Sequence, residues 1–578
     1  MGSIEASEKD ILSSYSVQAE SKKLLTEALL NNPKIAKDIP KEAYDFASRI
    51  TFKGSDLPSI PINWRFAESA ASLKAFEACI ISALVKRKYN VELTGAAIDT
   101  DHAQLFFMST LLWKINPDSD HPITLREVDG KDGLIPNYDI HNMASSLYRQ
   151  CATNIYRTKD GRYFHLHGSM NPDPTLESIG FPTDRPELQT WEQAMEPFIE
   201  KLATVDSAEI QHLASDVFKQ AGVIAETVDS FHASEHGRAN AHVGLFEIHA
   251  VPNQNHKPSW WPSTPQTSAK RPLAGLKVID LTRVIAAPSV TRGLAELGAS
   301  VMRVTSPNLC DYSGLHIDLN WGKWECSLDL KKEADKDKLR KLIKDADVVV
   351  QGYRPGVLDK YGFGQEGMID LVKDRERGII SVRENCYGWN GPWSYRSGWQ
   401  QISDACVGIS AGFGKAMGLK DNEAVTPVFP NSDYMTGIAG LTGILCALMR
   451  RAEEGGSYKI DVALNYYNQW LADSVGEYPE AIWQDVWKRN GKDVFRSYHN
   501  MNYMLPRYLG MIAKTGKLLK PAFFEDRETK ALNAVVRTVK PIIQFDNDQV
   551  ELKYNVGTRG NGKDAPRWPD DLMTEVVE

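Results

Sequence analysis

The chain has 578 residues, more than one hydrophobic core usually supports, so we expect two or more domains. Hydrophobic residues make up 42% of the sequence and charged residues 25%, the balance of ordinary globular proteins. The formal net charge of −8 excludes a strongly basic molecule, so no nucleic-acid partner is expected. It does not exclude a local basic pocket for an anionic cofactor.

Features of secretion and membrane attachment are missing from the sequence. Seven scattered cysteines with no CxxC spacing favour free thiols over disulfides or a zinc site. The N-terminal stretch MGSIEASEKDILSS lacks the apolar core of a secretory signal, and Ala6 stands where N-myristoylation requires Ser or Thr. We find no run of about 18 apolar residues of the kind that spans a membrane. We therefore expect a cytoplasmic protein with no membrane partner.

The first half of the chain reads as helices followed by a smaller lobe. Residues 1–57 predict an N-terminal helical segment, and the apolar spacing of residues 64–88 predicts a long helix. Residues 154–167 read as two strands joined by an Asp-Gly turn. The polar, Pro-rich stretch 251–272 predicts a linker, which makes residues 58–250 a separate lobe.

Strands and helices alternate beyond this linker. Strands are predicted at residues 276–281, 300–305, 324–330, 346–353 and 378–385, with helices at 288–298 and 333–344. Such alternation predicts an α/β fold with a doubly wound, mostly parallel sheet in a domain over 273–470, beside the smaller α+β lobe and helical segments. Ligands of such sheets bind beyond the carboxyl ends of the strands, here the loops after Leu281, Thr305, Val350 and Asn385. Residues 471–578 predict a C-terminal helical and strand segment, and glycine-rich residues 408–418 a mobile loop.

One acidic residue stands at the start of a strongly apolar helix. In PNSDYMTGIAGLTGILCALMRR (430–451), Pro430, Asn431 and Ser432 form a breaker-and-cap signal ahead of an apolar helical face. Asp433 then falls in the first helical turn, where the helix dipole and unpaired N–H groups favour negative charge. We expect an ionised carboxylate that can attack an acyl carbonyl, with a plain helix cap as the alternative.

A set of linked motifs resembles the class III CoA-transferase family, the CaiB/BaiF group. The motifs run from GLKVIDLTRVIAAPSVTRGLAELGASVMRVTSP through SLDLKK, ADVVVQGYRPGVLDKYGFG and GWNGPW to PVFPNSDYMTG and GSYKIDVALNYYNQWL. They cover about 200 residues, from Pro272 to Leu471. The resemblance implies a CoA-binding, Rossmann-like catalytic domain in which Asp433, ahead of Thr436 and Gly437, attacks an acyl-CoA to form a mixed anhydride.

The same resemblance implies contacts to coenzyme A, the acyl carrier, and no metal. CoA carries several phosphate charges, so basic side chains at sheet-end loops suit it. The residues expected to bind it are Val284, Ala286, Arg303, Lys323, Tyr353 and Arg354. Each basic residue could instead be an ordinary surface charge. Backbone N–H groups at the helix start and around Tyr387 and Gly388 are candidates to stabilise an oxyanion.

Departures from the family pattern narrow the chemistry. Racemases of this family place a His-Asp pair where this chain has Trp399 and Gln400, neither of which takes up a proton at neutral pH. Ile285 stands where some oxalate-pathway members have Gln. We therefore predict CoA transfer between an acyl-CoA and a carboxylic acid. The alternatives are a CoA-dependent racemase, isomerase or hydratase, and a silent CoA-binding protein.

The first half contains a weaker copy of the catalytic motif. Its segment from Trp64 can be laid on the segment from Asn431, which sets Glu68 opposite Asp433. We interpret this as a double-length family member with a degenerate N-terminal half, in which Glu68 is a structural acid. The family's interlocked dimers imply a homodimer or an intramolecular pseudo-dimer. His165, two residues before another histidine on a strand, lacks a third metal ligand and predicts structure rather than zinc.

Overall fold

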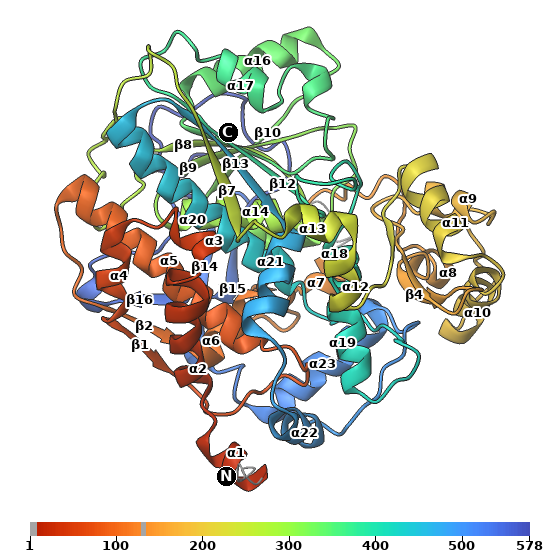
Figure 1. Cartoon of the computed structure of the whole chain (residues 1–578). Helices are drawn as coiled ribbons and strands as arrows, with labels where there is room; N and C mark the ends of the chain where they lie inside the picture. The colour runs from red at the N-terminus through yellow and green to blue at the C-terminus, as the bar shows by residue number, and fades with distance from the viewer. Residues whose placement is uncertain (1–7, 129–133, 578) are drawn as a thin grey trace.

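The computed structural model describes residues 8–128 and 134–577, so Ala6 lies outside the described residues. A seven-stranded sheet crosses the centre of the molecule in the order β10-β9-β8-β11-β12-β13-β7 (Figure 1). All neighbouring strands run parallel except β13 and β7. The strands are β7 (Phe246–Val251), β8 (Lys277–Leu281), β9 (Ser300–Thr305), β10 (Lys323–Ser327), β11 (Val348–Gln351), β12 (Ile380–Asn385) and β13 (Ser457–Ala463). The predicted mostly parallel sheet is confirmed.

Helices cover both faces of this sheet, which makes it doubly wound. Val278 of β8 packs into one core with the helices α14 (Ala286–Glu296) and α20 (Asn431–Glu454). Its neighbour Ile279 packs into a second core with α16 (Glu333–Asp345). Successive strand residues point to opposite faces, and both faces are buried. This double burial explains why the predicted strands read as continuous apolar runs.

The two ends of the chain meet in smaller sheets. One sheet pairs β1 (Ile50–Lys53) and β2 (Ala96–Asp99) with β16 (Ile543–Phe545), and another pairs β14 (Phe524–Thr529) and β15 (Ala534–Val539) with β3 (Lys114–Ile115). The predicted helical N-terminus consists of α1 (Glu8–Ser14), α2 (Val17–Lys23), a π-helix (Leu24–Leu30), α3 (Pro33–Ala36) and α4 (Lys41–Ala47). C-terminal residues therefore complete sheets that the first half begins.

A small lobe stands beside the main body, at the right of Figure 1. It holds the sheet β4 (Asn154–Arg157), β5 (Tyr163–Leu166) and β6 (Gly222–Ile224) and the helices α8 (Leu147–Gln150), α9 (Asp173–Ser178), α10 (Trp191–Leu202) and α11 (Ser207–Gln211). The predicted strand-turn-strand is confirmed as β4 and β5. The proposed linker 251–272 contains the buried Trp261, whose indole N–H donates to the carbonyl of Ala274 at 3.0 Å. The domain boundaries stay a prediction.

Helix α20 is buried almost from end to end. Its length and hydropathy of 1.2 would suffice for a membrane span, but the whole apolar window is buried inside the protein. On one side it packs against α5 (Phe66–Tyr89), itself buried from Phe66 to Val85, and on the other against α14. Because it is covered all round, its sequence is apolar all round. It is therefore the core helix of the molecule.

Glycines allow α20 to lie unusually close to α14. A Cβ atom added at Gly437 would stand 2.4 Å from the hydroxyl of Ser289, and one at Gly440 would stand 2.7 Å from a methyl group of Val290. Both contacts are shorter than side chains tolerate, so only glycine fits these two positions. The start of α20 is thereby held against the start of α14.

The first half repeats the succession helix, strand, helix of the second. α5 has 24 residues, as α20 has, and each carries an acid in its first turn, Glu68 and Asp433. α5 leads to β2 and α6 (Thr100–Phe106), whereas α20 leads to β13 and α21 (Leu464–Trp470). This order matches the internal likeness seen in the sequence. The duplication itself stays a prediction.

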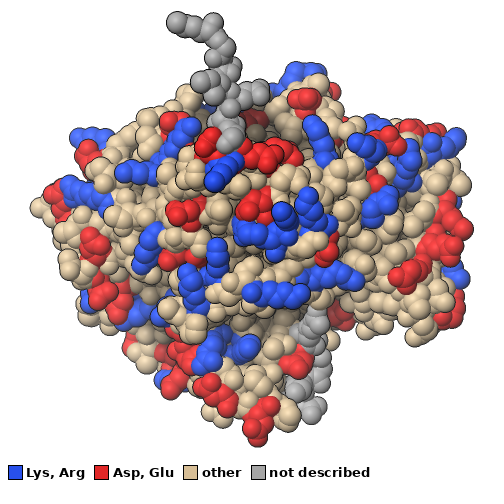
Figure 2. Space-filling model, turned by 90° about the horizontal axis from the view of Figure 1, so that it is seen from below, with Lys and Arg blue, Asp and Glu red and all other residues tan. Residues whose placement is uncertain are grey.

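Two further predictions concern local chemistry. The glycine-rich stretch expected to be a mobile loop instead forms the helix α19 (Ile409–Ala416), so that prediction was wrong. A Cβ at Gly414 would stand 1.9 Å from the carbonyl oxygen of Glu423, so this glycine serves close packing. All seven cysteines are free and buried, as expected. On the face shown in Figure 2, acidic and basic side chains are mixed, consistent with the absence of a general basic field.

The contact between α14 and α20 predicts opposite effects for two Gly→Ala changes. Gly440→Ala should lower stability by about 1–3 kcal/mol, because the added methyl group meets the stiff side chain of Val290. Gly510 of α23 (Met501–Thr515) has open space where a Cβ would stand, so Gly510→Ala should leave stability unchanged or raise it slightly. Thermal unfolding of both variants measures this. Equal melting temperatures would contradict the packing argument.

Candidate active site

Asp433 occupies the first turn of α20, as predicted. The predicted cap differs, because the helix begins at Asn431 and Pro430 offers no side-chain cap. The Asn431 amide instead donates to the hydroxyl of Tyr467 at 2.6 Å. The Asp433 side chain is 9% exposed, and its carboxylate has no hydrogen bond or ion pair with any residue that the structure describes. The carboxylate of Asp433 therefore remains open to a ligand, whereas the N–H groups of Asn431 and Tyr434 donate to the carbonyls of Phe429 and Pro430.

The pKa of Asp433 is displaced in the direction opposite to the one expected from its place at the helix start. Burial, followed by the charges of Glu384 and Asp404, raises the pKa of Asp433 well above its ordinary value. Burial also raises the pKa of Glu384 to about 8 and that of Asp404 to about 7, the latter despite hydrogen bonds from Asn468 and Gln400. Desolvation and like charges here outweigh the helix dipole, which would favour the ionised form.

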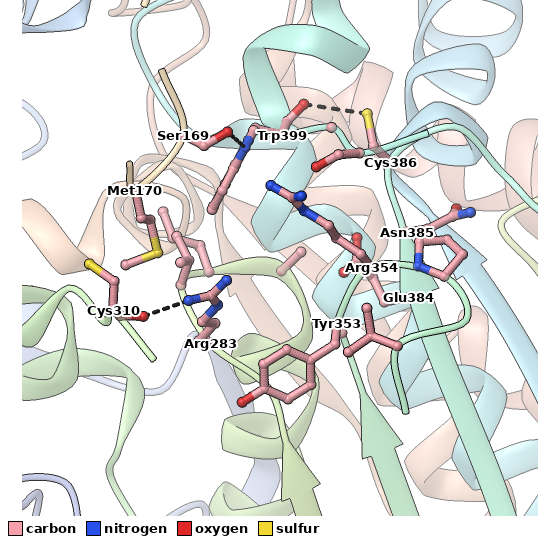
Figure 3. Close-up of a pocket in the computed structure, with 18 of the residues that line it drawn as sticks. Ser169, Met170, Arg283, Cys310, Tyr353, Arg354, Glu384, Asn385, Cys386 and Trp399 are labelled. Atoms are coloured by element: carbon pink, nitrogen blue, oxygen red, sulfur yellow. Dashed lines mark hydrogen bonds between the residues drawn. The ribbon is translucent and has the colours of Figure 1, made fainter. Parts of the chain in front are cut away.

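A cavity of about 360 Å³, which we call the rim cavity, opens at the carboxyl ends of the parallel strands (Figure 3). Its walls come from the loops that follow β8, β9, β11 and β12, which are the loops expected on the functional rim. Asp433 lines it from α20, and Ser169 and Met170 line it from the small lobe. The site therefore lies between the main sheet and the small lobe.

Two arginines of the rim cavity have no acidic partner. Arg283 donates to the carbonyl of Cys310 at 2.6 Å and lies 5.8 Å from the ring centre of Tyr353. Arg354 donates to the carbonyl of Lys219 at 3.1 Å. Neither forms an ion pair within the described residues. Partial burial and then the charge of Arg283 lower the pKa of Arg354, although a guanidinium stays charged. Uncompensated positive charge of this kind suits an anion.

The structure does not bring Arg303 and Lys323 to the rim cavity. Arg303 of β9 pairs with Asp311 at 2.6 Å and with Glu325 of β10 at 3.2 Å, and it is 1% exposed. Lys323 is fully buried and pairs with Asp280 of β8 at 2.9 Å. These ion pairs link three neighbouring strands, and a buried charge stripped of its partner is costly. Their role is therefore to hold the sheet, a correction to the expected CoA contacts.

The remaining predicted residues divide in the same way. Val284, Ala286, Tyr353 and Arg354 line the rim cavity. Gly388 lies outside the described cavity wall. Its N–H donates to the side chain of Asn385 at 2.8 Å and so is not open to an oxyanion. Tyr387 is fully buried, and its hydroxyl has no hydrogen-bond partner in the described structure. Neither Tyr387 nor Gly388 is among the described residues of the cavity wall.

Val284 is held in a strained conformation. Its φ of +73° lies in the left-handed region, which a β-branched residue rarely adopts and which costs about 1–3 kcal/mol. It lines both the rim cavity and a second cavity of about 290 Å³, as do Ile285, Trp399 and Asp433. We call this second cavity the side chamber. Asp433 therefore stands where the two cavities meet.

The other residues singled out in the sequence have structural partners. The carboxylate of Glu68 accepts hydrogen bonds from Tyr15 at 2.5 Å and Tyr478 at 2.9 Å, so no part of it is left for a ligand. His165 bonds the carbonyl of Leu166 at 2.8 Å. His167 stacks on Trp399, and burial lowers its pKa to about 3, so it is neutral. The side chains of Glu68 and His165 thus bond within the protein, and that of His167 stacks in the wall of the side chamber.

Sequence reasoning missed Arg283 and Glu384. Both stand at the carboxyl ends of predicted strands, two residues after Leu281 and directly after Arg383. The rule that ligands bind at these ends could have selected them. Charge alone could not have selected Arg283, because the equally basic Arg303 is paired within the sheet.

Comparison with known proteins places these features in a family. Residues 273–504 match CoA-transferase family III. The acetyl-coenzyme A transferase nodX of Hypoxylon pulicicidum is 51% identical over 565 residues, which cover 97% of this chain and 94% of that protein. An acyl-CoA transferase of Gibberella moniliformis is 32% identical, with 93% of each chain covered.

Other relatives match only part of the chain. The beta subunit of the succinyl-CoA–L-malate CoA-transferase of Chloroflexus aurantiacus is 34% identical over 34% of this chain and 50% of its own length. The crystal structure of a CaiB/BaiF family protein from Brucella suis is 28% identical over 36% of this chain and 54% of that one, with a TM-score of 0.30. The likeness to the two fungal transferases, by contrast, extends over nearly the whole chain. The chain therefore belongs to CoA-transferase family III and is a CoA-transferase.

Proposed function

We propose that this enzyme moves CoA between an acyl-CoA and a carboxylic acid through an acyl anhydride on Asp433. The observation that carries the proposal is the position of this carboxylate, buried, without a partner and shared by two cavities. The rim cavity offers Arg283 and Arg354 to an anion, and Tyr353 presents a ring beside them. The nucleotide end of CoA carries both phosphate charge and an aromatic base, so it suits this wall.

The chemistry balances with Asp433 as the only covalent group. Its carboxylate oxygen attacks the thioester carbonyl, the C–S bond breaks, and CoA leaves as a thiolate with the electron pair. The thiolate then attacks the aspartyl carbonyl of the anhydride and releases the first acid. The second acid attacks this aspartyl thioester, and the thiolate finally takes up the new acyl group, which restores the free carboxylate.

Proton-transfer chemistry at the α-carbon has less support. A racemase needs a second group that exchanges a proton, and the positions in question hold Trp399 and Gln400. The nearby His167 is neutral, with its pKa lowered to about 3, and is therefore a weak base. One relative, 51% identical to this chain, is named an acetyl-coenzyme A transferase, so acetyl-CoA is a candidate acyl donor by analogy.

Asp433→Asn should abolish transfer while the affinity for acyl-CoA changes little. The amide fills the same space but cannot form the anhydride, so we expect kcat/KM to fall at least about 1000-fold. Intact-protein mass spectrometry should show an acyl adduct that hydroxylamine removes from the wild type and no adduct on the variant. Glu68→Gln, the matching acid of α5, is the control and should stay active. An active Asp433→Asn variant would sink the assignment.

Glu384→Gln should move the acidic side of the pH–activity profile to lower pH. Asp433 must lose its proton to act, so activity falls as pH drops through its raised pKa. Removing the Glu384 charge removes one cause of that raised pKa, so the carboxylate ionises at lower pH. Glu366→Gln on the surface should leave the profile unchanged. A shift to higher pH would contradict the coupling of the two acids.

Arg283→Ala and Arg354→Ala should each raise the KM for acyl-CoA about tenfold, with smaller effects on kcat. Both charges face the rim cavity unpaired, so losing either weakens ground-state and transition-state binding alike. Steady-state kinetics at two salt concentrations measure this. Arg340→Ala, which removes a half-buried and paired arginine of α16 outside the rim cavity, is the control. An unchanged KM in both cavity variants would remove the anion site from the proposal.

A further inference from the structure

The side chamber meets the rim cavity at Asp433 and extends away from the arginines of the CoA-binding wall. Val284, Ile285 and Trp399 form the passage, since they line both cavities. A ligand whose thioester lies at Asp433 and whose nucleotide lies toward Arg354 can therefore place its acyl group in only one further described space. That space is the side chamber of about 290 Å³.

The walls of the side chamber are mostly apolar. Hydrocarbon and thioether side chains reach it from six separate positions of the chain, namely Leu111, Leu125, Met143, Met170, Leu315 and Leu505. Methionine is unbranched and polarizable, so Met143 and Met170 can adapt to ligands of different shape. An apolar cavity of about 150 Å³ holds a benzene molecule, so an acetyl group would fill only a small part of this chamber.

Positive charge is not available to a ligand in this chamber. Arg149 is the one permanently charged cation among the described side chains of its wall. Its guanidinium pairs with Asp173 at 2.6 Å and donates to the carbonyl groups of Asn142 at 3.0 Å and His141 at 2.8 Å. His167, also in the wall, is neutral. A second carboxylate on the acyl group would lose hydration here without gaining a cationic partner, which disfavours its binding.

Three neutral amide side chains of the wall, those of Gln150, Asn500 and Asn502, lie together at one end of the chamber. Asn502 donates to the side chain of Gln150 at 3.0 Å, and Asn500 donates to the carbonyl of Gln150 at 3.2 Å. They gather where α8 meets the start of α23. They can tolerate a neutral polar substituent on a ligand, but they supply no charge to balance an anionic one.

From these observations we infer that the side chamber is the acyl-binding site and that one of the two acids exchanged by this enzyme is a neutral, largely hydrocarbon monocarboxylic acid larger than acetate. This inference rests on the proposed function, because it takes Asp433 as the acyl acceptor. It goes further by naming the substrate class. It also assigns acyl selectivity to Leu111, Met143 and Met170 of the first half, which lie outside the segment 273–504 matched by the family.

Labelling of Asp433 by a panel of acyl-CoAs tests the inference. Pentanoyl-CoA and succinyl-CoA carry acyl groups of similar length, but only the latter carries a second carboxylate. We expect pentanoyl-CoA and octanoyl-CoA to form the acyl-enzyme at least about tenfold faster than succinyl-CoA, read by intact-protein mass spectrometry with hydroxylamine release. Succinyl-CoA labelling as fast as pentanoyl-CoA, or faster, overturns the inference and leaves the proposed function standing.

A variant that fills the chamber provides the second arm. Ala144 lines the chamber but is exposed, so Ala144→Phe should fold. It should slow labelling by octanoyl-CoA at least about tenfold and leave labelling by acetyl-CoA within about twofold. Ala208→Phe, at an exposed position of α11, is the matched control. Equal slowing of both acyl-CoAs, or of neither, overturns the placement of the acyl group. No labelling of the wild type by any acyl-CoA overturns the proposed function, and the inference falls with it.

Discussion

The close contact between α14 and α20 determines where the carboxylate of Asp433 lies. Because Gly437 and Gly440 carry no side chain, the two helices approach closely enough for the loop before α14 to face the first turn of α20. A second set of bonds fixes α14 on the sheet. Asp280 accepts a hydrogen bond from Thr291 of α14 at 2.6 Å and an ion pair from Lys323. The sheet, the loop after β8 and α20 are thus held together around Asp433.

The role of a charged residue in this enzyme depends on its neighbours rather than on its residue type. Arg303 and Lys323 are neutralised by acids within the sheet and contribute to its cohesion. Arg283 and Arg354 line the rim cavity without acids beside them, and under the proposed function they bind the nucleotide end of CoA. Asp433 is the opposite case, an acid that burial and neighbouring acids make costly to ionise. An arrangement that destabilises the free carboxylate makes its acylated, uncharged form comparatively favourable.

Much of the fold could be predicted from the sequence, because the spacing of apolar residues distinguishes buried strands from amphipathic helices. The strands of the main sheet and the placement of Asp433 in a first helical turn follow from such patterns. The wrong predictions share a different cause. Whether Arg303 pairs with Glu325 and whether the glycines of 408–418 bend or pack depend on partners elsewhere in the chain. Local patterns carry no information on them.

The mutual burial of α5 and α20 has a consequence for the way this protein is made. The two helices are separated by most of the chain, and α5 leaves the ribosome first. At ordinary rates of synthesis, on the order of tens of seconds pass before α20 follows. Throughout that interval α5 can pack on α2, α4 and α6, but the side that will meet α20 has no neighbour. The core around α5 is therefore completed only when residues 431–454 arrive.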